Sequence, residues 1–239
     1  MGTQTGGIAG VANGSQSATT KTLIIQSCYN TGIVSGKIIA GGIVGFNAYH
    51  GVTIKDCYNT AKITGQTYAG GISGNNQARI ETCYNTGEIV TAISFSAGGI
   101  TSYNGNVISS SIIANCYALN SKVTCNDSGN NSGIGRVVGW NVAGSMSGNY
   151  AFSTMQLYNG AVLVPVGTKG VGTKEGADIT FSQATSQTHY ETTCTWGFDA
   201  SGPWTFTYTP GTTYVGAGTN LPILKVFIGT AMQNPILIP

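Results

Sequence analysis

Two short sequence blocks alternate along residues 5–153, and this repetition constrains the fold more than any other feature of the chain. The first block is rich in glycine, and its copies are TGGIAGVAN, AGGIVGFN, AGGISGNN, AGGITSYN and the degenerate IGRVVGWN. The second block joins a cysteine to a tyrosine and recurs at Cys28, Cys57, Cys83 and Cys116, with a cysteine-free copy in SGNYAFS (147–153). Repeats of this period are typical of proteins that stack one structural unit on the next.

Each repeat contains three short segments rich in Ile, Val, Tyr and Thr, separated by Gly, Asn and Ser. The first group of residues favours strands, and the second marks turns. Ile43, Ile72 and Ile100 are 29 and 28 residues apart, a period shorter than the ~40–45 residues of a propeller blade. We therefore predict an all-β fold over residues 1–155: a right-handed parallel β-helix (β-solenoid) of about five coils, with about three strands per coil.

In a parallel stack, equivalent residues of successive coils form columns. Six positions after each of the first three cysteines the chain carries an aliphatic residue, at Val34, Ile63 and Ile89. We expect these residues to form an inward column. On the outer surface we expect Lys62 beside Glu88 and Lys55 beside Glu81, since opposite charges across neighbouring strands stabilise a sheet by roughly 0.2–1 kcal/mol.

The recurring cysteines raise the question of a metal or redox site. Zinc sites usually place cysteines about two to four residues apart, whereas these are 26–33 residues apart and His50 and His189 are isolated. We predict no metal and no cofactor, and an interior ladder of small apolar side chains at Cys28, Cys57, Cys83 and Cys116. A disulfide within the ladder, or between Cys116 and Cys125, stays open at this point.

A tyrosine follows each ladder cysteine, at Tyr29, Tyr58, Tyr84 and Tyr117. If cysteine points inward, alternation along a strand points tyrosine outward. The sequence thus predicts an aromatic column on one face, which is a candidate binding site for the sugar rings of a glycan or for a protein partner. The alternative is a column that stacks on itself beneath loops or the C-terminal segment.

Residues 156–239 lie outside the repeats and carry a dense group of aromatic residues, at Trp196, Phe198, Trp204 and Phe206. The ends of a solenoid expose strand edges that would otherwise pair with other chains. We therefore predict that residues 156–239 form a β-rich cap, or a small accessory domain, that packs on the solenoid and covers one end.

The composition excludes several classes of protein. Charged residues make up 8% of the chain and the net charge is +2, so the clustered Lys and Arg of a nucleic-acid-binding protein are missing. No apolar run approaches the ~18 residues of a membrane span. The opening residues, MGTQTGG, lack the regions of a signal peptide, and we expect any export signal to lie outside this sequence.

The acidic residues form no recognisable catalytic pattern, so we predict no catalytic residues. Polysaccharide-cleaving β-helices need carboxylates that converge, or a base with basic neighbours or calcium. No two acids occupy the same column on adjacent coils among Asp56, Glu81, Glu88, Asp127, Glu175, Asp178, Glu191 and Asp199. The loop GTKGVGTKEG (167–176) departs from a phosphate-binding loop, in which glycine, lysine and a hydroxyl residue follow one another.

The glycine block GGIVG beside CYNTGxI resembles the GLUG repeat over residues 5–155. That repeat is found in secreted and cell-surface proteins of bacteria, including gut Bacteroidetes, and in noncatalytic parts of some IgA-specific metallopeptidases. The segments SQATSQTHYETTCTWGFD and NLPILKV are similar to the closing segment that follows such repeats. The pattern departs at Arg136, which replaces a glycine, and at Asn149, which replaces a cysteine, so we expect an irregular fifth coil or one beside the C-terminal segment.

The resemblance implies a non-enzymatic, exported bacterial surface module that is adhesin-like and extracellular or at the cell surface. Such a module would bind a host or matrix glycan or protein through a solenoid face. Two alternatives stay open. One is a glycan-active β-helix enzyme, a lyase or a hydrolase. The other is a noncatalytic accessory region of a larger secreted peptidase.

Overall fold

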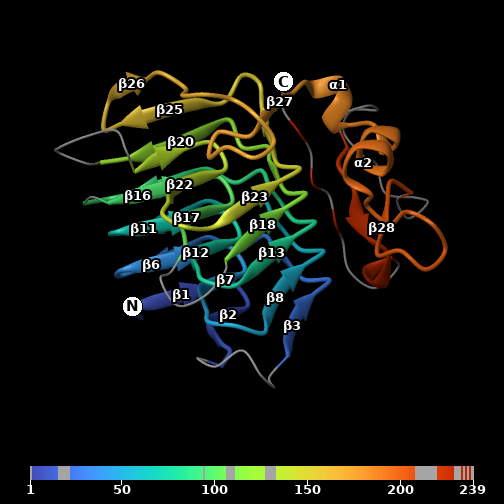
Figure 1. Ribbon diagram of the computed structural model, residues 1–239, viewed down its shortest axis with the longest axis horizontal. Helices are drawn as coiled ribbons and strands as arrows, with labels where there is room; N and C mark the ends of the chain where they lie inside the picture. The colour runs from blue at the N-terminus through green and yellow to red at the C-terminus, as the bar shows by residue number, and fades with distance from the viewer. Residues whose placement is uncertain are drawn as a thin grey trace.

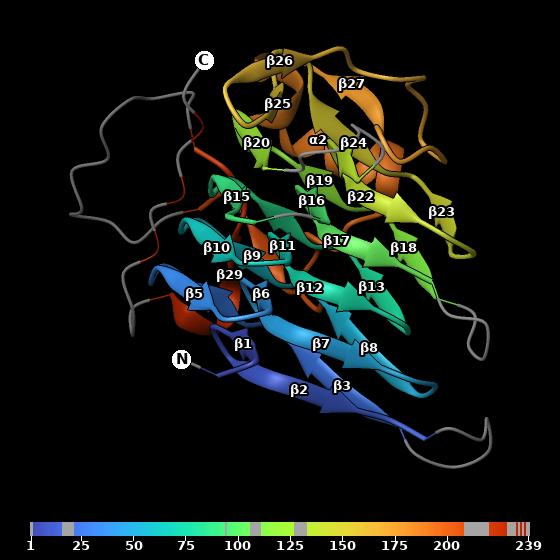
Figure 2. The same ribbon diagram turned by 90° about the vertical axis from the view of Figure 1, so that its left-hand side faces the viewer.

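The computed structural model describes residues 2–15, 22–93, 95–105, 111–126, 133–207 and 220–228, together with residues 233, 235 and 237. Within them the chain winds into a stack of short, mostly parallel strands (Figures 1 and 2). Five sheets, each of five or six strands, run along the stack, and a sixth sheet has two strands. The predicted all-β, parallel solenoid of about five coils is confirmed.

Each coil contributes five short strands rather than three. The first coil contains β1 (Gln4–Gly6), β2 (Ala9–Asn13), β3 (Leu23–Gln26), β4 (Tyr29–Asn30) and β5 (Val34–Gly36). The second contains β6 (Ile39–Gly41), β7 (Val44–Ala48), β8 (Val52–Lys55), β9 (Tyr58–Asn59) and β10 (Ile63–Gly65). The third contains β11 (Tyr68–Gly70), β12 (Ser73–Asn76), β13 (Arg79–Glu81), β14 (Tyr84–Asn85) and β15 (Ile89–Thr91).

The next two coils repeat the same order. The fourth contains β16 (Ser96–Gly98), β17 (Thr101–Asn104), β18 (Ile112–Ala114), β19 (Tyr117–Ala118) and β20 (Lys122–Cys125). The fifth contains β21 (Ile134–Gly135), β22 (Val138–Asn141), β23 (Ser145–Ser147), β24 (Tyr150–Phe152) and β25 (Gln156–Asn159).

Backbone kinks explain the additional strands. In the glycine block of the second coil, β6 ends at Gly41 and β7 begins at Val44, so the glycine pair divides one predicted segment into two. In the cysteine block, the residue before each cysteine has a positive φ, at Ser27 (53°), Asp56 (52°), Thr82 (49°) and Asn115 (55°). This left-handed backbone turns the chain between the strand before the cysteine and the strand that begins at the tyrosine.

The stack continues past the predicted boundary at residue 155. β25 pairs in parallel with β20, β27 (Ala177–Ile179) pairs in parallel with β24, and β26 (Val162–Val164) folds back antiparallel on β25. Leu157 is buried and lies in register with Val123. Leu157 thus adds one more position to the aliphatic column of Val34, Ile63 and Ile89. This is why parallel strand pairing continues beyond the last recognisable repeat.

The C-terminal segment contains α1 (Phe181–Ala184), α2 (Gln187–Cys194), β28 (Trp204–Thr205), β29 (Ile223–Leu224) and a 3-10 helix (Lys225–Phe227). It is therefore partly helical, with the one strand pair β28–β29. The other strands of the predicted β-rich segment 156–239 are β25, β26 and β27, and they belong to the solenoid stack. Figure 1 shows this segment along the right-hand side of the stack rather than over an end. No helix in the described part of the chain is long and apolar enough to cross a membrane.

Two interior features follow from the stacking. The aliphatic column is confirmed, because Val34, Ile63 and Ile89 pair in register and are buried. Two ladders of asparagine amides, buried except at Asn141, also run up the stack, each asparagine donating from Nδ2 to the Oδ1 of the next. They comprise Asn30, Asn59, Asn85 and Asn120 (2.7, 2.8 and 3.3 Å), and Asn47, Asn76, Asn104 and Asn141 (2.7, 2.8 and 2.9 Å).

One of the two expected charge pairs is present. Lys62 Nζ lies 2.9 Å from Glu88 Oε2. Lys55 is in register with Glu81, but the Glu81 carboxylate binds Arg79 on its own strand at 2.6 Å. Glu81 pairs with Arg79 rather than with Lys55 because Arg79 and Glu81 are two residues apart and point to the same side of the strand.

Arg136 closes the upper end of the stack. Equivalent positions in earlier coils are glycine, because a Cβ on Gly71 would lie 2.1 Å from the carbonyl oxygen of Gly99 in the next coil. On the far side of Arg136 there is no next coil with a carbonyl oxygen in this position; the segment that contains Glu175 and Gly176 lies there instead. The buried guanidinium donates to the carbonyl oxygens of these two residues, both at 2.9 Å. It also pairs with Asp178 at 2.6 Å. The fifth coil itself stays in register with the fourth.

Candidate functional site

The predicted tyrosine column exists. The rings of Tyr58 and Tyr84 stack with centroids 4.9 Å apart and an interplanar angle of 1°. Tyr29 stacks on Tyr58 at 5.2 Å, and Tyr117 stacks on Tyr150 of the fifth coil at 5.3 Å. The short strands β4, β9, β14 and β19 begin at these tyrosines, directly after the ladder cysteines.

The C-terminal segment covers this column. Tyr58 Oη donates to Gln233 Oε1 at 3.0 Å, Tyr84 Oη donates to the carbonyl oxygen of Pro222 at 2.8 Å, and Trp204 packs 5.8 Å from the Tyr84 ring. As a result Tyr58 is 1% exposed and Tyr84 and Tyr117 are 0% exposed.

The idea that these tyrosines form an exposed binding face is therefore wrong for Tyr58, Tyr84 and Tyr117. The alternative weighed against it, a self-stacked column beneath the C-terminal segment, is what the structure contains. Tyr29 is only partly buried, and Phe227 packs edge-on against its ring at 5.1 Å. The apolar faces of the column serve to attach the C-terminal segment to the flank.

The ladder cysteines are interior free thiols. Cys57, Cys83 and Cys116 are fully buried and Cys28, in the first coil, is partly buried. Each thiol donates to the carbonyl oxygen two residues earlier, for example Cys57 to Lys55 at 3.0 Å. Burial raises the pKa of the Cys83 thiol, which keeps it protonated and unreactive. Cys116 is a free thiol, so the disulfide between Cys116 and Cys125 is not formed. No group of side chains suited to a metal ion occurs in the residues described.

The acids have structural partners. Of the eight acids, Asp127 lies outside the described residues. Each of the other seven forms an ion pair or accepts a hydrogen bond. The pairs are Glu81 with Arg79, Glu88 with Lys62, Asp178 with Arg136, Glu175 with the Arg136 amide, Asp56 with Thr82, Glu191 with Gln187, and Asp199 with the Gly202 amide. Partial burial alone would raise the pKa of Asp178, but hydrogen bonds from Lys169 and Arg136 hold it below its usual value. Burial raises the pKa of Asp56, whose Oδ1 accepts from Thr82 at 2.7 Å. This pattern is typical of structural carboxylates.

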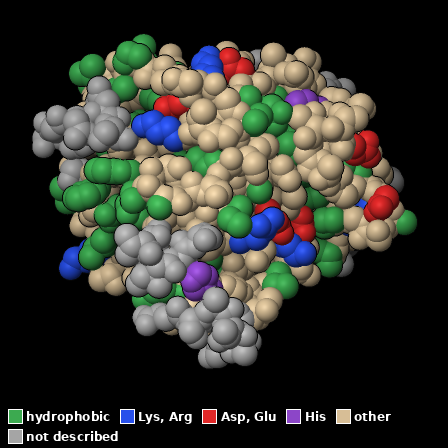
Figure 3. All heavy atoms as spheres, viewed as in Figure 1, with side chains coloured by type: hydrophobic (Ala, Val, Ile, Leu, Met, Phe, Trp, Pro, Cys, Tyr) green, Lys and Arg blue, Asp and Glu red, His purple; other side chains and the backbone are tan. Residues whose placement is uncertain are grey.

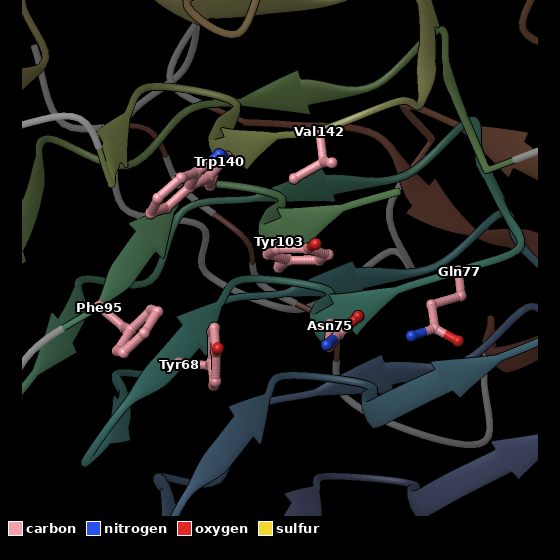
Figure 4. Close-up of a pocket in the computed structure, with 7 residues that line it drawn as sticks. All are labelled: Tyr68, Asn75, Gln77, Phe95, Tyr103, Trp140 and Val142. Carbon is pink, nitrogen blue, oxygen red and sulfur yellow. The ribbon is translucent and has the colours of Figure 1, made fainter. Parts of the chain in front are cut away.

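A groove on a different flank of the stack is the best candidate for a ligand site. We call it the aromatic groove; it has a volume of about 450 Å³ and is lined by Tyr68, Asn75, Gln77, Phe95, Tyr103, Trp140 and Val142 (Figure 4). These residues come from β11, β12, β17 and β22, from the turns that follow β12 and β22, and from the turn before β16. Figure 3 shows hydrophobic side chains gathered on the left of the molecule, on the side away from the C-terminal segment.

The stacking of coils positions the aromatic groove. Asn75, Tyr103 and Trp140 occupy equivalent positions on three successive coils, because Asn75 pairs with Tyr103 and Tyr103 pairs with Trp140. Tyr68 reaches the same groove from the neighbouring sheet, with its ring 6.3 Å from Tyr103 and 5.6 Å from Phe95. Trp140 is 39% exposed and Phe95 is 51% exposed. Both rings therefore remain accessible to a ligand.

Sequence reasoning missed the aromatic groove, although a signal was present. The residue before the asparagine of each glycine block points outward, and it varies from Phe46 to Asn75, Tyr103 and Trp140. The residues that are identical in successive repeats predicted the tyrosine column. The accessible aromatic residues lie instead at a position where the repeats differ.

Comparison with known proteins gives a likeness of fold. No family model and no curated protein matches the chain. The crystal structure of a candidate immunoglobulin A1 protease from Bacteroides ovatus superposes with a TM-score of 0.63 at 23% sequence identity. The match covers 84% of this chain and 57% of that one, so the chain spans little more than half the length of that protein. The likeness supports the solenoid fold, and membership of the GLUG family stays a prediction.

Proposed function

We propose that this chain is a non-enzymatic, exported, adhesin-like surface module that binds a host or matrix glycan or protein through the aromatic groove. The observation that carries the proposal is the groove itself. It presents four aromatic side chains and two amides on an accessible flank, which is the composition of a site that binds by stacking and hydrogen bonding. The carboxylates of the described residues, in contrast, are engaged in structural contacts.

Two further observations support an exported protein. The repeats resemble those of secreted and cell-surface bacterial proteins, and the fold is shared with the Bacteroides ovatus protein. Because that protein is a candidate immunoglobulin A1 protease, a second candidate function is a noncatalytic accessory region of a larger secreted peptidase. In that case the aromatic groove would bind the protein substrate or the surface on which the peptidase acts.

The experiment is a glycan and matrix-protein array probed with the purified chain. We expect binding, and we expect Trp140→Ala to weaken it by about tenfold or more, because an accessible tryptophan offers the largest aromatic contact surface and contributes a large share of the contact energy. Tyr158→Ala is the matched control, since Tyr158 lies outside the groove beneath Lys122. An array with no bound ligand, or equal binding by Trp140→Ala, would contradict the proposal.

A further inference from the structure

The aromatic groove has no charged lining. Its residues come from three stretches of the chain, 63–78, 89–121 and 137–168, that contain no Asp, Glu, Lys, Arg or His. The Tyr68 hydroxyl also stays neutral at physiological pH, since burial and the neighbouring Tyr103 raise its pKa. A ligand with formal charges would find no partner here and would lose solvation on binding. The groove therefore suits an uncharged ligand.

One polar atom of the groove lacks a partner. Asn75 Oδ1 is buried from solvent and accepts no hydrogen bond within the described residues. A buried acceptor without a donor costs free energy. The Asn75 residue itself is only partly buried, so rotation of its amide group turns Oδ1 toward the groove, where a donating ligand hydroxyl removes that cost. Figure 4 shows Asn75 beside Tyr103, at the middle of the row of lining side chains.

The spacing of the coils indicates how such a ligand would lie. Asn75, Tyr103 and Trp140 follow one another on adjacent coils, which are about 4.8 Å apart. That step is close to the length of one pyranose residue in an extended chain. Successive sugar residues laid parallel to the stack axis would therefore meet successive side chains of this column. Their C–H faces are electropositive and suit the negative faces of the Tyr103 and Trp140 rings.

We propose that the aromatic groove binds a neutral, linear glycan that lies along the stack axis, with sugar rings on Tyr103 and Trp140 and a sugar hydroxyl donating to Asn75 Oδ1. This inference rests on the proposed function and narrows it from glycan or protein to one ligand class. The groove is shallow and contacts one side of the ligand. We therefore expect a dissociation constant on the order of 0.1–1 mM for an oligosaccharide.

The test is titration calorimetry with the full chain and neutral β-1,4-linked oligosaccharides of one to six glucose, mannose or N-acetylglucosamine residues. Sialylated and sulfated oligosaccharides of equal length are the charged comparison. We expect the neutral oligosaccharides to bind with an affinity that rises with length over the first few residues. Binding should not change between low and high salt, because no ion pair is involved. The charged oligosaccharides should not bind.

Two substitutions link binding to the groove. Asn75→Leu removes the acceptor and should weaken binding about tenfold, while Gln156→Leu, an exposed amide outside the groove, should leave it unchanged. Thermal unfolding of each variant confirms that it is folded. Tighter binding of charged sugars, binding that weakens with salt, or equal affinity in Asn75→Leu would overturn the inference. If matrix proteins bind in a Trp140-dependent way but no oligosaccharide binds, the inference fails and the proposed function stands.

Discussion

Replacing Gly71 by alanine is expected to lower the free energy of unfolding by about 3 kcal/mol or more. A Cβ at this position would lie 2.1 Å from the carbonyl oxygen of Gly99 and 2.3 Å from Asn85 Cγ. The first of these is backbone of the next coil, so the clash cannot be relieved by a side-chain rotation. The coils would have to separate locally, which breaks strand pairing and the asparagine ladder together.

Gly32→Ala is the matched control for Gly71→Ala. The nearest atom to a Cβ on Gly32 is Asn30 Oδ1 at 3.7 Å, an ordinary contact. Alanine also reduces the conformational freedom of the unfolded chain, so we expect stability to be unchanged or to rise by up to about 1 kcal/mol. Urea unfolding followed by circular dichroism measures both variants. Similar stability of the two would show that the coils are not packed at the spacing described here.

Replacing Asn59 by leucine is expected to cost about 3 kcal/mol. The buried Asn59 side chain donates to Asn85 Oδ1 at 2.8 Å and to the carbonyl oxygen of Ala61 at 2.8 Å, and it accepts from Asn30 and from the Ala61 amide. Leucine has a similar volume but can make none of these bonds. The buried backbone N–H and C=O of Ala61 would both be left without a partner, each at about 1–3 kcal/mol.

Asn141→Ala tests whether that loss is specific to a buried amide. Asn141 is the exposed end of the second ladder, bonded to Asn104 at 2.9 Å and to Gly144 O at 3.0 Å. After substitution the Gly144 carbonyl oxygen can bond to water, and only the buried Asn104 amide loses its acceptor. We therefore expect a cost of about 1 kcal/mol, well below that at Asn59. Urea unfolding measures both variants, and the shift of the midpoint is converted to a free energy of unfolding with the same dependence on urea concentration for each. A cost at Asn141 that equals the cost at Asn59 would mean that burial does not decide the contribution of the ladder.

The fold was predictable because the repeats fix it locally. Each of the first four coils brings its own glycine pair, cysteine and asparagine, and stacking alone then dictates the columns. The number of strands per coil was not predictable from residue preferences. The decisive kinks occur at residues as different as Ser27, Asp56 and Thr82, which share only a left-handed backbone. Nothing in a threonine suggests that conformation, and the packing of the column imposes it.

The position of the C-terminal segment and the site were less predictable. Residues 181–207 carry no repeat, so their docking depends on contacts across the chain, such as Trp196 Nε1 to the Asn115 carbonyl oxygen at 3.0 Å. Such contacts produce no periodic pattern in the sequence. Covering the tyrosine column removed the candidate face, and the accessible aromatic residues proved to be Tyr103 and Trp140, where the repeat varies. Residues that are identical in successive repeats proved to be structural. The residues that line the groove lie at positions that vary between repeats.

Hydroxyl-radical footprinting read by mass spectrometry tests directly whether the C-terminal segment seals the tyrosine column while the aromatic groove stays open. The chain has three tryptophans, and their exposed fractions are 39% for Trp140, 3% for Trp196 and 0% for Trp204. We expect Trp140 and Phe95 to be oxidised at least about tenfold faster than Trp196, Trp204 and Tyr84, since the reaction rate of an aromatic side chain follows its contact with solvent. Oxidation of Trp204 and Tyr84 as fast as that of Trp140 would contradict the account, because it would place the tyrosine column, and not the groove alone, within reach of a ligand.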